Sequence, residues 1–179
     1  MILSFSTQLN GKPTYFVEKI WQGFPEADQY FEEWFTDGKM YEQYDFHPDA
    51  YGMFPKIHTI REDKAERWKS GMMIDFFINA RKKDMFRFAP RIPVLSIQEI
   101  FMTRRGSMLE ITIAKEGSYI GDNDFYLDVC GHGTLAKNDG FDEYADFRNY
   151  FIKIIEENGK ATGNYWFKGI IVHWTDFKY

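Results

Sequence analysis

Several residue patterns are missing from this chain, and each absence excludes a class of protein. The 179 residues include a single cysteine, Cys130, which rules out a disulfide framework and a zinc site built from several cysteines. No apolar run approaches the ~20 residues of a membrane-spanning helix. The first residues also lack the basic and apolar regions of a cleavable signal peptide. We therefore expect a reduced, cytoplasmic protein without a membrane partner.

The sequence is also poor in motifs that hold metals or cofactors. The acidic run at 122–124 is not the start of an EF-hand, because Gly133 occupies the twelfth position of such a loop, where a glutamate is required. The Cys130-Gly131-His132 triplet has no further ligands nearby, and the other histidines are scattered. No glycine-rich phosphate loop of the Walker or Rossmann kind is present. We predict neither a metal nor a cofactor.

Positive charge is scarce overall but concentrated in one segment. The formal net charge of −5 argues against a general nucleic-acid-binding surface. Residues 23–49 hold eight acidic residues and one lysine, whereas residues 80–105 hold seven basic and two acidic residues. Aromatic residues interleave with this basic set, as in single-strand binding surfaces, although charged hairpin tips often only protect a sheet edge. The candidate nucleic-acid contacts are Arg81, Lys82, Lys83 and Arg87.

Aromatic residues are abundant, with 18 Phe, 11 Tyr and 5 Trp, so a large core is expected. Hydrophobic periodicity and turn residues predict an α+β fold in one domain, 1–179, in which short strands form a small barrel with helices attached. We expect strands near 2–7, 57–61, 72–79, 85–89, 94–103, 108–114 and 124–130, and a last β pair at 164–168 and 170–175. Helices are expected at 13–22, 25–36 and 143–158.

One segment carries a recognisable motif. It reads Lys56-Ile57-His58-Thr59-Ile60-Arg61-Glu62 and continues with Trp68-Lys69-Ser70-Gly71; Ala136-Lys137-Asn138-Asp139-Gly140-Phe141 follows later. Both stretches resemble the ASCH family, a branch of the PUA-like β-barrels. The resemblance implies a β-barrel with flanking helices. In the family, the glycine that ends the first helix nearly abuts the motif lysine, whereas residues 24–55 separate Gly23 from Lys56 here, so we interpret 24–55 as an insertion.

The resemblance implies a pocket for a base or nucleoside, lined by the motif residues Lys56, Thr59, Arg61 and Trp68. A lysine offers three donors and an arginine a planar fork that fits a phosphate or carboxylate. Trp68 is either a stacking surface or a core residue, and Arg61 either holds a ligand or pairs with a neighbouring carboxylate. The first hypothesis is therefore a module that binds a nucleotide, a modified nucleoside or RNA.

Two alternatives stay open. The small bacterial acetylcytidine amidohydrolases of this family use a threonine, a lysine and a glutamate. Thr59 and Lys56 match the first two, and the third falls near Asp139, a shorter carboxylate that could instead cap a helix. In such an enzyme Lys56 would deprotonate the Thr59 nucleophile. The third hypothesis is a protein–protein interaction module with a vestigial pocket, whose working surface is the acidic, aromatic insertion.

The spacing of Lys56 and Thr59 sets a geometric condition. Side chains alternate along a strand, so residues three apart face opposite sides. Lys56 and Thr59 can share a pocket only if Lys56 precedes the strand or a bulge intervenes. Pro55 favours a turn at this point because it cannot donate to a strand ladder.

Overall fold

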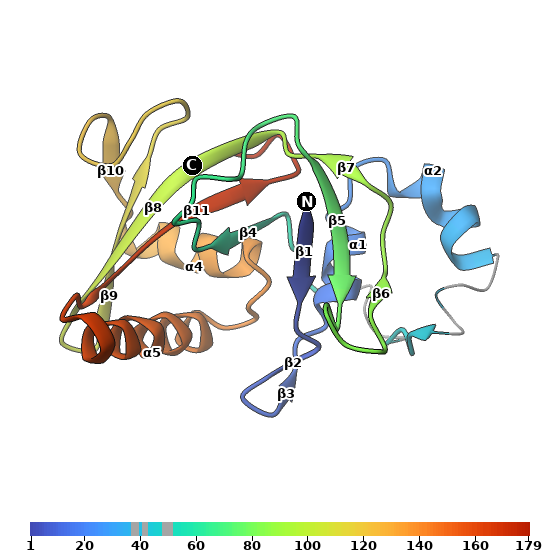
Figure 1. The fold of residues 1–179 in the computed structure, drawn as a ribbon, viewed down its shortest axis with the longest axis horizontal. Helices are drawn as coiled ribbons and strands as arrows, with labels where there is room; N and C mark the ends of the chain where they lie inside the picture. Colours follow the sequence, from blue (N-terminus) through green and yellow to red (C-terminus); the bar gives the residue numbers. More distant parts are fainter. Residues whose placement is uncertain (37–39, 41–42, 48–51) are drawn as a thin grey trace.

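The computed structural model describes residues 1–36, 40, 43–47 and 52–179 and has an α+β fold (Figure 1). One sheet joins β1 (Ile2–Phe5), β5 (Met73–Ile78), β6 (Phe86–Arg87) and β7 (Ile92–Pro93), with β1 parallel to β5. The second sheet is antiparallel, in the order β10 (Asp124–Tyr126), β9 (Met108–Ala114), β8 (Ser96–Arg105), β11 (Trp166–His173) and β4 (His58–Arg61). A small ribbon pairs β2 (Gln8–Leu9) with β3 (Lys12–Pro13).

The helices are α1 (Phe16–Gln22), α2 (Ala27–Phe31), the π-helical turn η1 (Glu32–Thr36), α4 (Val129–Asn138) and α5 (Tyr144–Thr162). Helix α5 buries Phe147, Phe151 and Ile155, which are spaced by four residues and so form one stripe. This stripe packs on the second sheet, where the rings of Phe151 and Phe167 lie 5.2 Å apart. No described helix has the length and apolar character needed to cross a membrane.

The buried side chains form two hydrophobic clusters, one on each sheet. The first cluster contains residues of β1, β5 and α1, and Trp21 of α1 donates its indole N–H to the Phe88 carbonyl oxygen (2.9 Å). The second lies between α5, α4 and the antiparallel sheet. Strand β11 reaches both, because Ile171 belongs to the second cluster whereas Val172 belongs to the first, together with Trp174 just after the strand.

The residues on either side of the predicted insertion, Gly23 and Lys56, lie next to each other in the fold. The backbone N–H of Lys56 donates to the Lys19 carbonyl oxygen (2.9 Å), and a Cβ added to Gly23 would lie 2.7 Å from the Lys56 carbonyl oxygen. Gly23 and Lys56 therefore touch although 24–55 separates them in sequence. Trp34 and Phe35, from the described part of the insertion, are buried in the first cluster, so these rings stabilise the fold. That the acidic residues of this segment bind a protein partner remains a prediction.

Two element predictions were wrong. The strand expected at 124–130 ends at Tyr126, and helix α4 begins at Val129, with Asp128 accepting a hydrogen bond from the Gly131 N–H as its N-cap (2.7 Å). Gly131 and Gly133 lower helix propensity and concealed this helix. The last two β segments are one strand, β11. Gly169 lies within it because a Cβ there would be 2.6 Å from the Arg61 carbonyl oxygen.

Candidate functional site

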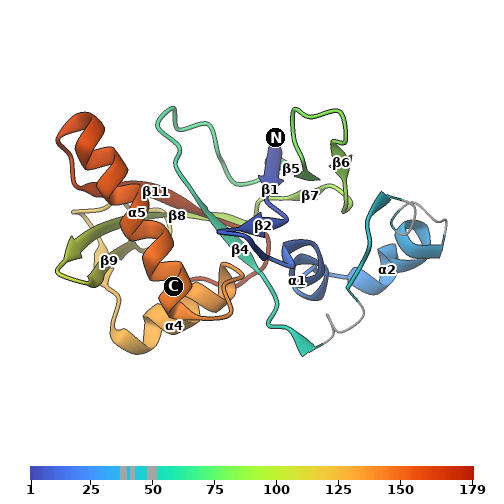
Figure 2. The ribbon, with the colours of Figure 1, turned by 90° about the horizontal axis from the view of Figure 1, so that it is seen from below.

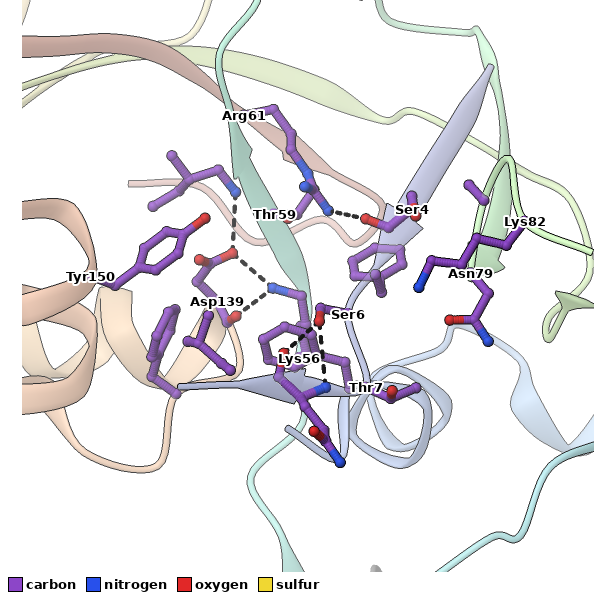
Figure 3. Close-up of a pocket in the computed structure, with 17 residues that line it drawn as sticks. Ser4, Ser6, Thr7, Lys56, Thr59, Arg61, Asn79, Lys82, Asp139 and Tyr150 are labelled. Atoms are coloured by element: carbon purple, nitrogen blue, oxygen red, sulfur yellow. Dashed lines mark hydrogen bonds and ion pairs between the residues drawn. The ribbon is translucent and has the colours of Figure 1, made fainter. Parts of the chain in front are cut away.

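A cavity of about 480 Å³ lies where the two hydrophobic clusters meet. Its walls come from β1 and β2, α1, β4, the loop after β5, the turn after α4, and α5 (Figure 3). Lys56, Thr59, Arg61 and Asp139 all line it. The structure thus brings together four of the residues selected from sequence, and they come from two segments that lie far apart in the chain.

The local geometry meets the condition set by the spacing of Lys56 and Thr59. Strand β4 begins at His58, so Lys56 precedes it and is free of the alternation along the strand. Thr59 and Arg61 are two residues apart on β4 and share a face. Figure 2 shows β4 running between the α4–α5 side of the molecule and α1. The motif therefore presents three side chains to one cavity.

Lys56 and Asp139 form a buried ion pair. The exposed fractions of their side chains are 2% and 8%, and Lys56 Nζ lies 2.7 Å from Asp139 Oδ1. The same ammonium donates to the Asp139 backbone carbonyl, and Oδ1 also accepts the backbone N–H of Ile60 (3.1 Å). Burial lowers the pKa of Lys56 to about 8, although Asp139 opposes that shift. Burial likewise raises the pKa of Asp139 against the effect of Lys56.

The Lys56 side chain is confined by an aromatic ring and by a glycine. Its Nζ lies 4.9 Å from the centroid of the Phe16 ring, within cation–π range. Gly140 has φ +90°, and a Cβ there would lie 2.9 Å from Lys56 Cδ. A side chain at position 140 would be strained by its backbone and would collide with Lys56. This glycine is therefore part of the site.

Arg61 forms no ion pair within the described part of the chain. One of its terminal nitrogens, Nη2, donates to the Ser4 carbonyl oxygen (2.7 Å), but its buried Nε has no hydrogen-bond partner among the described residues. No described carboxylate lies within ion-pair distance of the guanidinium, so the sequence alternative of a carboxylate-paired Arg61 is not what the structure shows. Lys82 lines the same cavity from the loop after β5. Among the described residues, neither Arg61 nor Lys82 has an ion-pair partner, although the charge of the nearby Asp139 carboxylate acts on Arg61 and opposes the lowering of its pKa by burial.

Thr59 is 3% exposed and lines the cavity, and its hydroxyl makes no hydrogen bond to a described residue. The hydrogen bonds of the Lys56 ammonium both go to Asp139. The nucleophile and base suggested by the resemblance thus share a cavity, yet they are not hydrogen-bonded to each other in this state.

The other residues selected from sequence do not join the site. Trp68 lines a second cavity of about 460 Å³, together with Tyr119 and Trp166, so its expected place beside Lys56 was wrong. Segment 62–69 turns away after β4 and carries it there. Of the basic set, only Lys82 lines the first cavity. Arg81 and Lys83 are exposed on the same loop, and the Arg87 guanidinium lies over the Trp34 ring, 5.5 Å from its centroid.

Sequence reasoning missed two residues of the site, Lys19 and Tyr150. Tyr150, on helix α5, lines the cavity, and burial raises its pKa. Lys19 is 1% exposed and contacts the turn after Asp139. The available signal was a lysine placed between the apolar residues Val17 and Ile20 of α1.

Chemically, the cavity combines a neutralised lysine–aspartate pair, an unpaired guanidinium, a free hydroxyl and aromatic walls. Among the described residues, no three histidine, cysteine or carboxylate side chains gather as a metal site requires. Comparisons of the chain with protein-family models, curated proteins and solved structures found no match.

Proposed function

We propose that this protein is an ASCH-type module of the PUA-like β-barrel class and that it binds a nucleotide, free or as one unit of RNA, in the cavity beside Lys56. The observation that carries the proposal is the Arg61 guanidinium, which lines an aromatic-walled cavity, forms no ion pair with any described carboxylate and leaves its buried Nε without a hydrogen-bond partner among those residues. A modified nucleoside would use the same walls. The sequence resemblance supports the same ligand class.

The charges of the cavity favour an anionic ligand. Asp139 neutralises Lys56, and this leaves the positive charges of Arg61 and Lys82. An arginine fork binds phosphate oxygens through parallel hydrogen bonds, which are stronger than those between neutral groups. A phosphate supplies the negative charge that the cavity lacks.

The distribution of side chains orients the ligand. Tyr150 and Asp139 lie on one side of the cavity and Lys82 on the other, with Arg61 between them (Figure 3). Phe16, Tyr150 and the remaining Asp139 oxygen offer a stacking surface and an acceptor for a base. We place the base beside Tyr150 and the phosphate toward Lys82.

Replacing Lys82 by methionine tests the phosphate position. We expect about fivefold weaker binding of a nucleoside 5′-monophosphate, because an exposed charge pair contributes about 1 kcal/mol at most, and unchanged binding of the parent nucleoside. Isothermal titration calorimetry with the four ribonucleosides and their monophosphates measures both. Lys83→Met is the matched control, because Lys83 is exposed on the same loop but does not line the cavity. Equal affinities of the two variants for the monophosphate, or no binding by wild type, would reject the proposal.

Binding of a short single-stranded RNA distinguishes a free nucleotide from a nucleotide that is part of RNA. If the ligand is part of RNA, Lys83→Met and Arg81→Met weaken RNA binding while leaving monophosphate binding unchanged. The affinity for RNA then also falls as salt rises, since each phosphate contact releases counterions. If the ligand is a free nucleotide, the RNA binds no more tightly than the monophosphate.

Hydrolysis of an acylated nucleoside is a second candidate, favoured by the free Thr59 hydroxyl beside a lysine whose pKa lies near 8. The Thr59 oxygen would attack the acyl carbon as neutral Lys56 takes its proton. Lys56 would return that proton to the departing amine, and water would then hydrolyse the threonine ester.

Acetate release from acetylcytidine tests this candidate. Wild type should release acetate at a rate that rises as pH approaches 8, because more Lys56 is then neutral. Thr59→Val keeps the shape but removes the nucleophile and should abolish release, whereas Thr59→Ser should retain it. Release by Thr59→Val at the wild-type rate, or none by wild type, rejects this candidate and leaves the binding proposal intact.

A further inference from the structure

We infer that Lys19 is a positioning residue of this site, which fixes the turn carrying Asp139 against Lys56. Its relevance to a ligand rests on the proposed function, but the placement of Asp139 can be tested without one. Lys19 contacts the chain on both sides of the Lys56–Asp139 ion pair.

Lys19 contacts both segments that carry the ion pair: the turn that follows Asp139 and the chain at Lys56. Its ammonium donates to the Gly140 carbonyl oxygen (2.9 Å) and lies 2.7 Å from Asp142 Oδ1. Its own carbonyl oxygen accepts the backbone N–H of Lys56 (2.9 Å). One residue of α1 therefore ties the chain before β4 to the turn after α4.

Two buried lysines donate hydrogen bonds to backbone carbonyl groups at the C-terminal end of helix α4. Lys56 donates to the Asp139 carbonyl, and Lys19 donates to the next carbonyl, that of Gly140. Carbonyl groups at a helix C-terminus lack intrahelical partners and carry partial negative charge, which cations stabilise. The two ammonium groups therefore fix successive peptide groups of the turn.

The burial of Lys19 indicates a specific role. Its side chain is 2% exposed, and a charged group is costly to bury unless it is paired. Its carboxylate partner Asp142 is itself 65% exposed, so much of the compensation comes from the Gly140 carbonyl. Without that ammonium, the turn would lose its contact with α1, and the Asp139 carboxylate would lose its fixed position beside Lys56 and the Ile60 amide.

The test is hydrogen exchange at the Ile60 amide, which donates to Asp139 Oδ1. In Lys19→Met we expect exchange at Ile60 to become about tenfold faster than at the amides of β8, because the local opening becomes easier. Ile20→Val is the matched control: Ile20 is the next residue of α1 and fully buried, but its side chain has no polar contact with the turn. In that control, Ile60 and β8 amides should accelerate together.

Rescue and ligand binding complete the experiment. Lys19→Arg keeps a cationic donor and should retain Ile60 protection. If Lys19→Met does not fold, Asp142→Asn replaces it: this exposed change loosens the ammonium, and we expect Ile60 exchange about threefold faster than β8 exchange. If exchange at the Ile60 amide accelerates by the same factor as exchange at the β8 amides in the tested variant, the inference is overturned. If wild type binds no nucleotide while Lys19→Met still frees the Ile60 amide, the proposed function fails and the positioning role stands.

Discussion

Replacing Asp139 by alanine is expected to lower the free energy of unfolding by about 3–5 kcal/mol, the usual cost of removing one partner of a buried ion pair. The change leaves the Lys56 ammonium buried without a carboxylate, since that side chain is 2% exposed. It also removes the acceptor of the Ile60 N–H. Denaturant unfolding monitored by tryptophan fluorescence measures the loss.

A double-mutant cycle measures the interaction energy between Lys56 and Asp139 separately from their other contacts. Lys56→Met combined with Asp139→Ala should be less destabilised than the sum of the two single variants, because the uncompensated charge is gone. Glu157→Ala is the surface control: Glu157 is 64% exposed, and its one ion pair with a described residue is with Lys153 at 4.0 Å, so a change within about 0.5 kcal/mol is expected. An Asp139→Ala effect as small as that of the control would mean that the pair is not buried as described.

Acidification should destabilise the fold through two buried histidines, His58 and His173, both 0% exposed. Burial lowers the pKa of His173 to about 4 and that of His58 well below its usual value. The folded state therefore keeps both rings neutral, whereas unfolded histidine takes up a proton near pH 6.5. Below that pH the unfolded state binds more protons, so stability falls by about 1.4 kcal/mol per pH unit for each histidine until the folded pKa is reached.

The histidine effect is isolated by substitution. Neither ring nitrogen of His173 has a hydrogen-bond partner among the described residues, so His173→Phe removes the titration without breaking such a bond. Between pH 7 and pH 5, the unfolding free energy of this variant should fall less steeply than that of wild type, by up to about 1.4 kcal/mol per pH unit, because His132, which is also buried with a lowered pKa, contributes equally to both proteins. The raised pKa of Asp139 acts in the opposite direction and is common to both proteins, so it cancels in the comparison. Identical slopes would show that His173 is not buried and neutral in the fold.

Lys56, Thr59 and Arg61 were selected from one motif and Asp139 from a second because both stretches resemble the ASCH family; local periodicity alone would have treated Lys56 as a solvated lysine and Thr59 as an ordinary strand residue. The structure places all four on one cavity. Trp68 was misplaced because spacing along a chain does not show where a loop turns. Lys19 was missed because its role depends on a carbonyl group 121 residues away, which no local pattern encodes.

In the fold, too, the elements with a strong local sequence pattern were predicted, whereas those that depend on contacts between distant residues were not. Strand β9 was predicted at its observed limits, 108–114, because apolar and polar residues alternate there. Helix α4 was missed because two glycines weaken its local signal, and packing of Leu135 and Ala136 in the second cluster overrides that weakness. The contact between Gly23 and Lys56 also depends on tertiary packing, and it was expected only from the family resemblance, in which the corresponding glycine and lysine are close in sequence.

If a nucleotide occupies the first cavity beside Lys56, methyl NMR with a nucleoside 5′-monophosphate should locate it, because Ile60 and Leu9 line that cavity whereas Ile97 and Ile170 line the second. We expect saturable shifts of the Ile60 and Leu9 methyl signals with one common dissociation constant, and unchanged Ile97 and Ile170 signals. Shifts confined to Ile97 and Ile170, or no shifts at saturating ligand, would contradict it.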